Sequence, residues 1–293
     1  MRTIVFVLLF FTQISFAQIL PEKERALLKD EILEDRFKNI LPGLMEDANI
    51  DMWLLISREY NEDPVLKTML PATWLNARRR TIIVFYRNKK EKIIERLAVA
   101  RYNIGKSIQS SWDKEKEPSQ WKALVDIIAS RNPDKIGINF SKHFALADGL
   151  VKTDFDELLE NLPETYQERL VSAEKLAIGW LEARSKMEMK LYKKLVKITH
   201  DIIDEAFSAN VIQTGITTTE DIVWFMRQKV TDLGLETWFH PTVDIQRNNE
   251  VLKSHIESFS KGKEEKTIQK GDLLHCDFGI TYIGLNTDCQ QHA

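Results

Sequence analysis

The sequence predicts an α/β domain followed by an α+β region that ends in a β-hairpin, both behind a short apolar leader. Three observations carry this prediction. Helix-like and strand-like segments alternate between residues 18 and 180, which is the pattern of an α/β domain. Two helices with capping motifs follow one another from residue 185. Two strand-like runs separated by a short turn then lie between residues 273 and 289.

The composition is that of an ordinary globular protein. Of the 293 residues, 43% are hydrophobic and 29% are charged, and 14 Phe, 7 Trp and 6 Tyr supply material for buried cores. The formal net charge is −3, so no global field attracts nucleic acid. Two cysteines are too few for a disulfide scaffold or a four-cysteine zinc site. Composition therefore excludes a disordered chain, a multi-span membrane protein and a nucleic-acid partner, and the length predicts roughly two domains.

The first 17 residues have the order of a signal peptide. A short basic start precedes the uninterrupted apolar run 4–11, and Ser15 and Ala17 then form the small-x-small pattern of a cleavage site. A membrane span needs about 20 apolar residues, so this run is too short for one. We expect cleavage after Ala17 and export to a periplasmic or extracellular space, with no membrane association afterwards. The alternative interpretation of the run is a buried N-terminal strand.

The region 18–180 is predicted to alternate between helices and strands. Two segments have apolar residues near helical spacing, and these are 22–40, which Pro42-Gly43 should end, and 121–130. Four runs of apolar and β-branched residues are predicted strands: 52–56, 81–86, 92–99 and 135–140. Alternation at this spacing favours a mixed or parallel sheet.

The region 181–293 begins with two predicted helices. Ser185 and Glu188 have the spacing of a capping box, and apolar residues at helical spacing follow them. Thr217 and Glu220 repeat this spacing, so we expect a second helix that ends at Gly234. A polar stretch over 248–266 is then expected to be an exposed loop.

The predicted hairpin carries two aspartates. Its arms are residues 273–278 and 282–289, with Asp277 on the first and Asp288 on the second. We expect the two carboxylates to lie opposite one another on one face, where they would repel unless a cation lies between them. Carboxylate oxygens suit Mn²⁺ and Mg²⁺ and tolerate Zn²⁺ or Co²⁺. The alternative is that both aspartates are simply solvated, as is usual in turns.

The residues around these aspartates follow a recognisable order. A Gly271-Asp272 turn, a hydrophobic strand, the motif Asp277-x-Gly279 and a second Asp eleven residues later occur together. This order resembles that of the pita-bread metallopeptidases, the family of methionine aminopeptidase, aminopeptidase P, prolidase and the metal-free relative creatinase. The run 183–188, with Arg184, Lys186 and Glu188, is similar to that family's entry into its catalytic domain. After the signal peptide expected over 1–17, the resemblance implies a creatinase-like α/β domain over 18–180 and an incomplete α+β pita-bread catalytic domain over 181–293.

The resemblance also implies roles for individual residues. Asp277 would bind one metal ion and Asp288 would bridge two, with Mn²⁺ as the expected ion and Co²⁺ or Zn²⁺ as alternatives. A histidine upstream of the first Asp would contact the substrate or a transition-state oxygen. His255 is the candidate and His240 the second choice, although a surface histidine without a catalytic partner is an equal interpretation of either.

Strand alternation places further residues around the hairpin. His275 shares the face of Asp277 and is either a residue that surrounds the metal ligands or a buried structural histidine. Cys276 and Cys289 are expected to be cross-strand neighbours on the opposite face, where they could form a disulfide in an exported protein.

The family's remaining ligands, a His and two Glu, follow the second Asp by many tens of residues. Only residues 289–293 follow Asp288 here, and His292 lies too close to it to be that ligand. We therefore expect this chain to be a fragment or truncated form of a longer enzyme, with a two-carboxylate site that binds metal weakly.

The creatinase-like domain narrows the expected function, because methionine aminopeptidases generally lack it. The resemblance implies an Xaa-Pro aminopeptidase or dipeptidase that hydrolyses the N-terminal peptide bond of short peptides, and it leaves a homodimer open. Two alternatives remain: a metal-independent creatinase-like amidinohydrolase, and a non-catalytic binding or assembly protein of the same fold.

Overall fold

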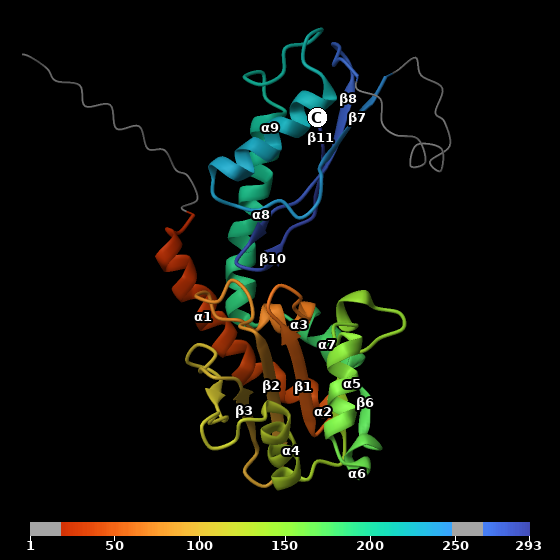
Figure 1. The fold of residues 1–293 in the computed structure, drawn as a ribbon. Helices are drawn as coiled ribbons and strands as arrows, with labels where there is room; N and C mark the ends of the chain where they lie inside the picture. Colours follow the sequence, from red (N-terminus) through yellow and green to blue (C-terminus); the bar gives the residue numbers. More distant parts are fainter. Residues whose placement is uncertain (1–18, 248–265) are drawn as a thin grey trace, which may run out of the picture. The chain divides into compact units, whose positions relative to one another are not determined.

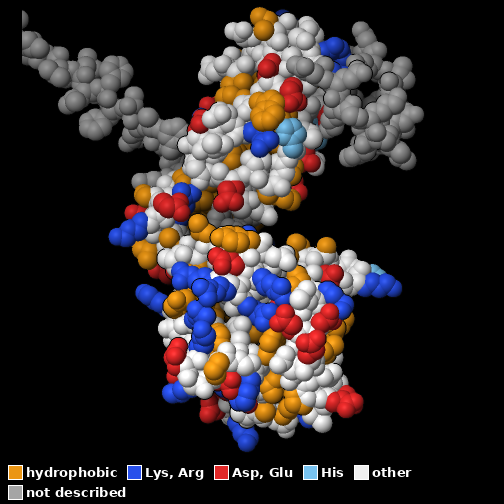
Figure 2. All heavy atoms as spheres, in the orientation of Figure 1, with side chains coloured by type: hydrophobic (Ala, Val, Ile, Leu, Met, Phe, Trp, Pro, Cys, Tyr) orange, Lys and Arg blue, Asp and Glu red, His pale blue; other side chains and the backbone are white. Residues whose placement is uncertain are grey.

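The computed structural model describes residues 19–247 and 266–293. It divides into two compact units, which are described separately: the amino-terminal unit, Glu22–Lys190, and the carboxy-terminal unit, Leu191–Ala293 with the residues before Glu22. The assignment of residues 18–180 to a creatinase-like domain stays a prediction. On the face seen in Figure 2, acidic and basic side chains are interspersed on each unit.

A six-stranded mixed sheet forms the centre of the amino-terminal unit (Figure 1). The strands are β1 (Met52–Arg58), β2 (Arg80–Asn88), β3 (Ile93–Val99), β4 (Gln109–Ser110), β5 (Ile136–Ile138) and β6 (Leu170–Ser172), in the order β4-β3-β2-β1-β5-β6. β1, β2 and β3 are antiparallel neighbours, whereas β5 and β6 continue the sheet in parallel beside β1. The four strands expected in this region are confirmed, as is the mixed sheet.

Helices bury both faces of this sheet. The helices are α1 (Glu22–Asn39), α2 (Leu41–Asp47), α3 (Pro64–Thr68), α4 (Gln120–Arg131), α5 (Lys152–Asn161), α6 (Glu164–Gln167) and α7 (Glu174–Glu182), with a 3₁₀ turn at Ala145–Ala147. Because successive strand residues point to opposite faces, Trp53 packs with α1, α2 and α7, while Leu54 packs with α4 and α5. Pro42 does not simply end the first helix; it lies in the first turn of α2, where a missing N–H costs nothing.

The two helices of the carboxy-terminal region begin at capping boxes. In α8 (Lys186–Ala206), Ser185 N donates to Glu188 Oε2 at 2.6 Å, as predicted. The box of α9 (Thr219–Asp232) uses Thr218 and Asp221, one residue later than predicted. Thr217 does not cap the helix, because its hydroxyl accepts a hydrogen bond from Gln213 N at 2.9 Å and closes the preceding turn. None of the described helices has the length and apolar character needed to cross a bilayer.

A three-stranded antiparallel sheet lies against α8 and α9 (Figure 1). Its strands are β7 (Thr242–Gln246), β8 (Leu273–Phe278) and β11 (Cys289–His292), in the order β11-β8-β7. The predicted second hairpin arm, 282–289, is wrong as one strand, because β9 (Thr281–Tyr282) and β10 (Leu285–Asn286) form a small separate hairpin. The core under the sheet includes Ile202, Met226, Cys276 and Phe278. The predicted polar loop at 248–266 lies almost entirely outside the described residues.

Candidate metal centre

Asp277 lies within β8, whereas Asp288 lies between β10 and β11, and the two aspartates do not lie opposite one another. Asp277 pairs with Gln290 of β11 on one side and Thr242 of β7 on the other. Asp288 precedes Gln290 by two residues and lies just outside β11. Asp277 is half-buried and Asp288 is exposed. The predicted direct pairing of the aspartates is therefore wrong by two residues.

The turn between β9 and β10 sets this register. Ile283 and Gly284 have φ of 52° and 77°, so both central residues of the turn are left-handed. Such turns match the twist of a hairpin and strongly favour glycine at the second central position. The pairs Tyr282–Leu285 and Cys289–Phe278 then follow in one register from this turn. The prediction misplaced the turn by one residue, which moved every pair by two.

The glycine of the Asp-x-Gly motif permits a close approach of the chain just before Asp288. A Cβ atom at Gly279 would lie 2.0 Å from the carbonyl oxygen of Thr287 and 2.7 Å from Trp238 Nε1. No side chain fits that space without moving backbone atoms. Gly279 therefore lets the two parts of the motif lie side by side.

The Gly-Asp turn before β8 ties this strand to the end of β7. Gly271 has φ of 94°, a conformation in which other residues are strained. Asp272 accepts two hydrogen bonds from Arg247, from Nε at 2.6 Å and from Nη2 at 2.8 Å. This fork-to-fork pair fixes the start of the strand that carries Asp277.

Two histidines accompany Asp277 on its face of the sheet. His275 of β8 pairs with His292 of β11, and their ring centroids are 4.7 Å apart. Asp244 of β7 flanks His275 on its other side. His275 is half-buried, in keeping with its predicted place on the face of Asp277.

The opposite face carries the cysteines, which are free thiols. Cys276 is buried and pairs with Gln291, so the expected cross-strand pairing with Cys289 is wrong. Gln291 is itself held by α8, since His200 Nδ1 lies 3.0 Å from its Oε1 and its Nε2 donates to Asp204 at 2.8 Å. Burial raises the pKa of the Cys276 thiol to about 11.

Of the two candidate substrate histidines, the structure describes His240, whereas His255 lies outside the described residues. His240 is exposed just before β7, with its Nδ1 3.5 Å from Arg227 Nη1 and its ring edge against Trp224. Both neighbours belong to α9, which packs on the sheet face opposite Asp277.

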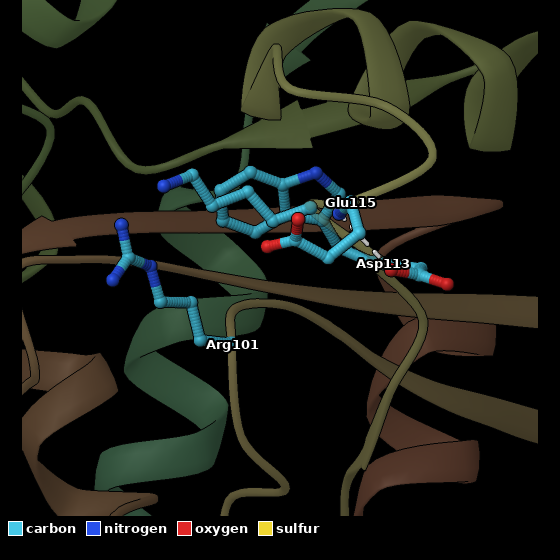
Figure 3. Close-up of a pocket in the computed structure, with 5 residues that line it drawn as sticks. Arg101, Asp113 and Glu115 are labelled. Carbon is cyan, nitrogen blue, oxygen red and sulfur yellow. Dashed lines mark hydrogen bonds between the residues drawn. The ribbon is translucent and has the colours of Figure 1, made fainter.

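Two pockets of the amino-terminal unit lie away from these residues. A pocket of about 400 Å³ in the amino-terminal unit is lined by Arg101, Trp112, Asp113, Lys114 and Glu115 (Figure 3). Asp113 Oδ1 accepts a hydrogen bond from Glu115 N at 3.1 Å, so the loop is folded on itself. A second pocket, of about 610 Å³, lies in the same unit around Asp51 and Arg131. Neither contains a predicted metal ligand.

The two aspartates fit a divalent metal by chemistry, since both are carboxylates, and Asp288 lies two residues from Gln290, the strand partner of Asp277. Within residues 19–247 and 266–293, no group of three or more His, Cys, Asp or Glu side chains could hold a metal ion. The role of Asp277 and Asp288 as metal ligands stays a prediction.

Comparison with known proteins gives a family match for this region. Residues 190–291 match the family model of metallopeptidase family M24. The predicted resemblance to the pita-bread metallopeptidases is therefore confirmed. No curated protein sequence matches the chain.

Solved structures agree on the fold. The chain is similar to the X-Pro aminopeptidase from Thermotoga maritima MSB8, with a TM-score of 0.57, 15% identity, and coverage of 86% of this chain and 64% of that one. It is also similar to Escherichia coli aminopeptidase P, with a TM-score of 0.55 at 12% identity over 94% of this chain and 62% of that one. For proline aminopeptidase P II from Yersinia pestis the TM-score is 0.53 at 12% identity, over 93% and 63%. The chain thus spans less than two thirds of each relative, and the predicted fold class, an α/β domain followed by part of a pita-bread domain, is confirmed.

Proposed function

We propose that the chain acts in metal-dependent peptide hydrolysis of the Xaa-Pro type, cleaving the N-terminal peptide bond of short peptides. The observation that carries the proposal is that residues 190–291, which match the M24 family model, contain both Asp277 and Asp288, with Asp288 two residues from the strand partner of Asp277. The similar structures from Thermotoga maritima and Escherichia coli, an X-Pro aminopeptidase and an aminopeptidase P, support the substrate class.

The two aspartates differ in the part they would play. Asp277 is half-buried in β8, between β7 and β11. Asp288 is exposed and lies outside the strands, so its carboxylate would be accessible to a bound ion. Divalent ions bound there would supply activation of water and polarisation of the peptide carbonyl. We propose Mn²⁺ as the ion, with Co²⁺ or Zn²⁺ as alternatives, and His255 or His240 as the group that contacts the substrate.

Metal titration tests this proposal directly. Mn²⁺ is titrated into the full chain by calorimetry, beside the variants Asp277→Asn and Asp288→Asn. Asp201→Asn is the matched control, because Asp201 is a carboxylate on the exposed side of α8 that pairs with Lys197. We expect each site variant, but not the control, to weaken binding. Equal affinity in all four proteins contradicts the metal role.

Activity is measured in the same proteins with an Xaa-Pro-Xaa tripeptide and an Xaa-Ala-Xaa tripeptide. Hydrolysis that requires Mn²⁺, stops with a chelator and prefers proline at the second position supports the proposed substrate class. Mn²⁺ binding without hydrolysis of either peptide favours a non-catalytic binding protein of the same fold.

The metal-independent amidinohydrolase remains the second candidate function, because creatinase shares the fold. The presence of both Asp277 and Asp288, the expected metal ligands, argues against it. Equilibrium dialysis with Mn²⁺ separates the two candidates: no retention of the ion favours the amidinohydrolase.

We further propose that the chain is exported and cleaved after Ala17. The basic, apolar and small-residue order of the first 17 residues supports this proposal. Mass spectrometry of the chain from the periplasm or medium should give a mature form that begins at Gln18. A chain that keeps Met1 and stays with the cytosol contradicts export.

A further inference from the structure

Thr287, the residue before Asp288, has its hydroxyl group held on both sides in the core of the carboxy-terminal unit. Its side chain is 1% exposed, and its Oγ1 lies 2.8 Å from Oγ1 of Thr199, which is fully buried on α8. Thr199 uses its own proton to donate to the carbonyl oxygen of Leu195 at 2.9 Å. The proton between the two hydroxyls therefore belongs to Thr287, which donates to Thr199.

The same hydroxyl replaces a backbone acceptor in the strand ladder. Ile280 N donates to Thr287 Oγ1 at 3.0 Å, while Thr287 N donates to Ile280 O at 2.9 Å. In an ordinary antiparallel pair, Ile280 N would donate to the carbonyl oxygen of Thr287. Because the Thr287 hydroxyl accepts this hydrogen bond, the Thr287 carbonyl oxygen accepts one from Trp238 Nε1 instead, at 2.8 Å.

The backbone and hydroxyl groups of Thr287 thus form hydrogen bonds with three separate segments. These are α8, the loop before β7 and the link between β8 and β9. The next residue is Asp288, which lies between β10 and β11 and outside both. Asp288 is exposed, and the peptide that joins it to Thr287 is held through the Thr287 carbonyl oxygen, which accepts from Trp238 Nε1.

We propose that Thr287 is a positioning residue for the Asp288 carboxylate, and that Thr199 and Trp238 hold it in place. The inference rests on the proposed function, in which Asp288 is a metal ligand. A valine at position 287 keeps the shape of the side chain but loses both hydroxyl hydrogen bonds, so Ile280 N is left without its acceptor.

The test compares Thr287→Val, Thr287→Ser and Thr199→Val in the full chain. Groups that orient a metal ligand typically change metal affinity by about 10–100-fold when removed. We expect Thr287→Val to weaken Mn²⁺ binding within that range and Thr199→Val to weaken it in the same direction. Thr287→Ser keeps the hydroxyl and should bind Mn²⁺ as the unaltered chain does.

A second readout needs no metal. Amide hydrogen exchange at residues 288 and 289 should be faster in Thr287→Val than in Thr287→Ser. The matched control is Thr217→Val, another buried threonine of the same unit whose hydroxyl accepts from Gln213 N. Thr217→Val should lower the stability of the unit but change neither the Mn²⁺ affinity nor the amide exchange at residues 288 and 289.

The outcomes separate the inference from the function on which it rests. An unaltered chain that binds no Mn²⁺ contradicts the proposed function and the inference with it. An unaltered chain that binds Mn²⁺ with the same affinity as Thr287→Val contradicts the inference alone. If Thr287→Val does not fold, Thr199→Val decides, since it leaves Thr287 hydrogen-bonded to Ile280.

Discussion

Arg36 and Glu188 are 152 residues apart in the sequence and form a buried ion pair, with Arg36 Nη1 at 2.9 Å from each carboxylate oxygen. Their side chains are only 9% and 6% exposed. Arg36 also donates to the carbonyl oxygens of Ala183 and Trp180 and lies 4.4 Å above the Trp180 ring. Glu188 thus has two tasks, because it caps α8 and also neutralises an arginine of α1. This double use gives a physical reason for the Glu in the run 183–188 that resembles the family's entry motif.

Removing Arg36 should strongly destabilise the amino-terminal unit. Arg36→Ala leaves the carboxylate of Glu188 buried without its cation, which typically costs about 3–5 kcal/mol of unfolding free energy. Urea unfolding followed by tryptophan fluorescence measures the change. Lys197→Ala, which breaks an exposed pair with Asp201 on α8, is the control and should change stability by at most about 0.5 kcal/mol. Equal effects of the two substitutions would contradict the buried pair.

The Arg247–Asp272 pair should make the carboxy-terminal unit acid-sensitive. The hydrogen bonds from Arg247 hold the pKa of the Asp272 carboxyl below its ordinary value, against the opposing effect of burial. The unfolded chain binds this proton at higher pH than the folded chain does. The pair therefore contributes fully above the ordinary Asp pKa of about 3.9, and this contribution is lost as the pH falls through the lower native pKa.

Urea unfolding between pH 6 and pH 2 tests this dependence in the unaltered chain and in Asp272→Asn. We expect the unaltered chain to be more stable at pH 6 and the difference to shrink below about pH 3.9. Parallel curves over the whole range would show that Asp272 has the same pKa in the folded and unfolded states.

Gly279→Ala should disrupt the hairpin around the candidate site. The added methyl group would lie 2.0 Å from the Thr287 carbonyl oxygen, so the backbone must shift, at a cost of about 1–3 kcal/mol or more. Thermal unfolding by circular dichroism measures it. Gly43→Ala in α2 is the control, because its Cβ meets no atom within 4 Å and alanine favours a helix by about 1 kcal/mol. A Gly279→Ala protein as stable as the unaltered chain would contradict the close approach.

The Cys276 thiol should be inert in the folded protein. With a pKa of about 11, roughly 0.1% of it is thiolate at pH 8, and the side chain is fully buried. A Cys289→Ser variant should show no reaction with a thiol reagent in native buffer and one equivalent in denaturant. The unaltered chain should release two equivalents in denaturant, and none would indicate a disulfide.

Local sequence patterns were sufficient for much of the fold. The apolar runs that became β1 and β2, and the Ser185–Glu188 capping box, were predicted within a few residues. Each depends on neighbours in the chain: burial on both faces of a short run, or a hydroxyl three residues from a carboxylate. The second capping box was misplaced by one residue because Thr217 and Thr218 both have an acidic residue three positions later, and only the preceding turn decides between them.

The candidate site was predictable in its residues but not in its pairing. The order of Gly271, Asp272, Asp277, Gly279 and Asp288 pointed to the metallopeptidases, and residues 190–291 match the model of that family. The observed strand register differs from the predicted one by two residues, because the register depends on which two residues of the turn adopt positive φ. The contacts of Thr287 with Thr199 and Trp238 leave no periodic signal, so no local pattern could have indicated them.

The sequence by itself determined most of the element types and the match of residues 190–291 to the M24 family model, since both depend on short-range spacing. Tertiary structure alone decided that Asp277 faces Gln290, that the cysteines stay apart, and that Glu188 neutralises Arg36. The reason is that such contacts join segments far apart in the chain. Their geometry follows from how helices and strands pack, and a pattern within one segment does not contain it.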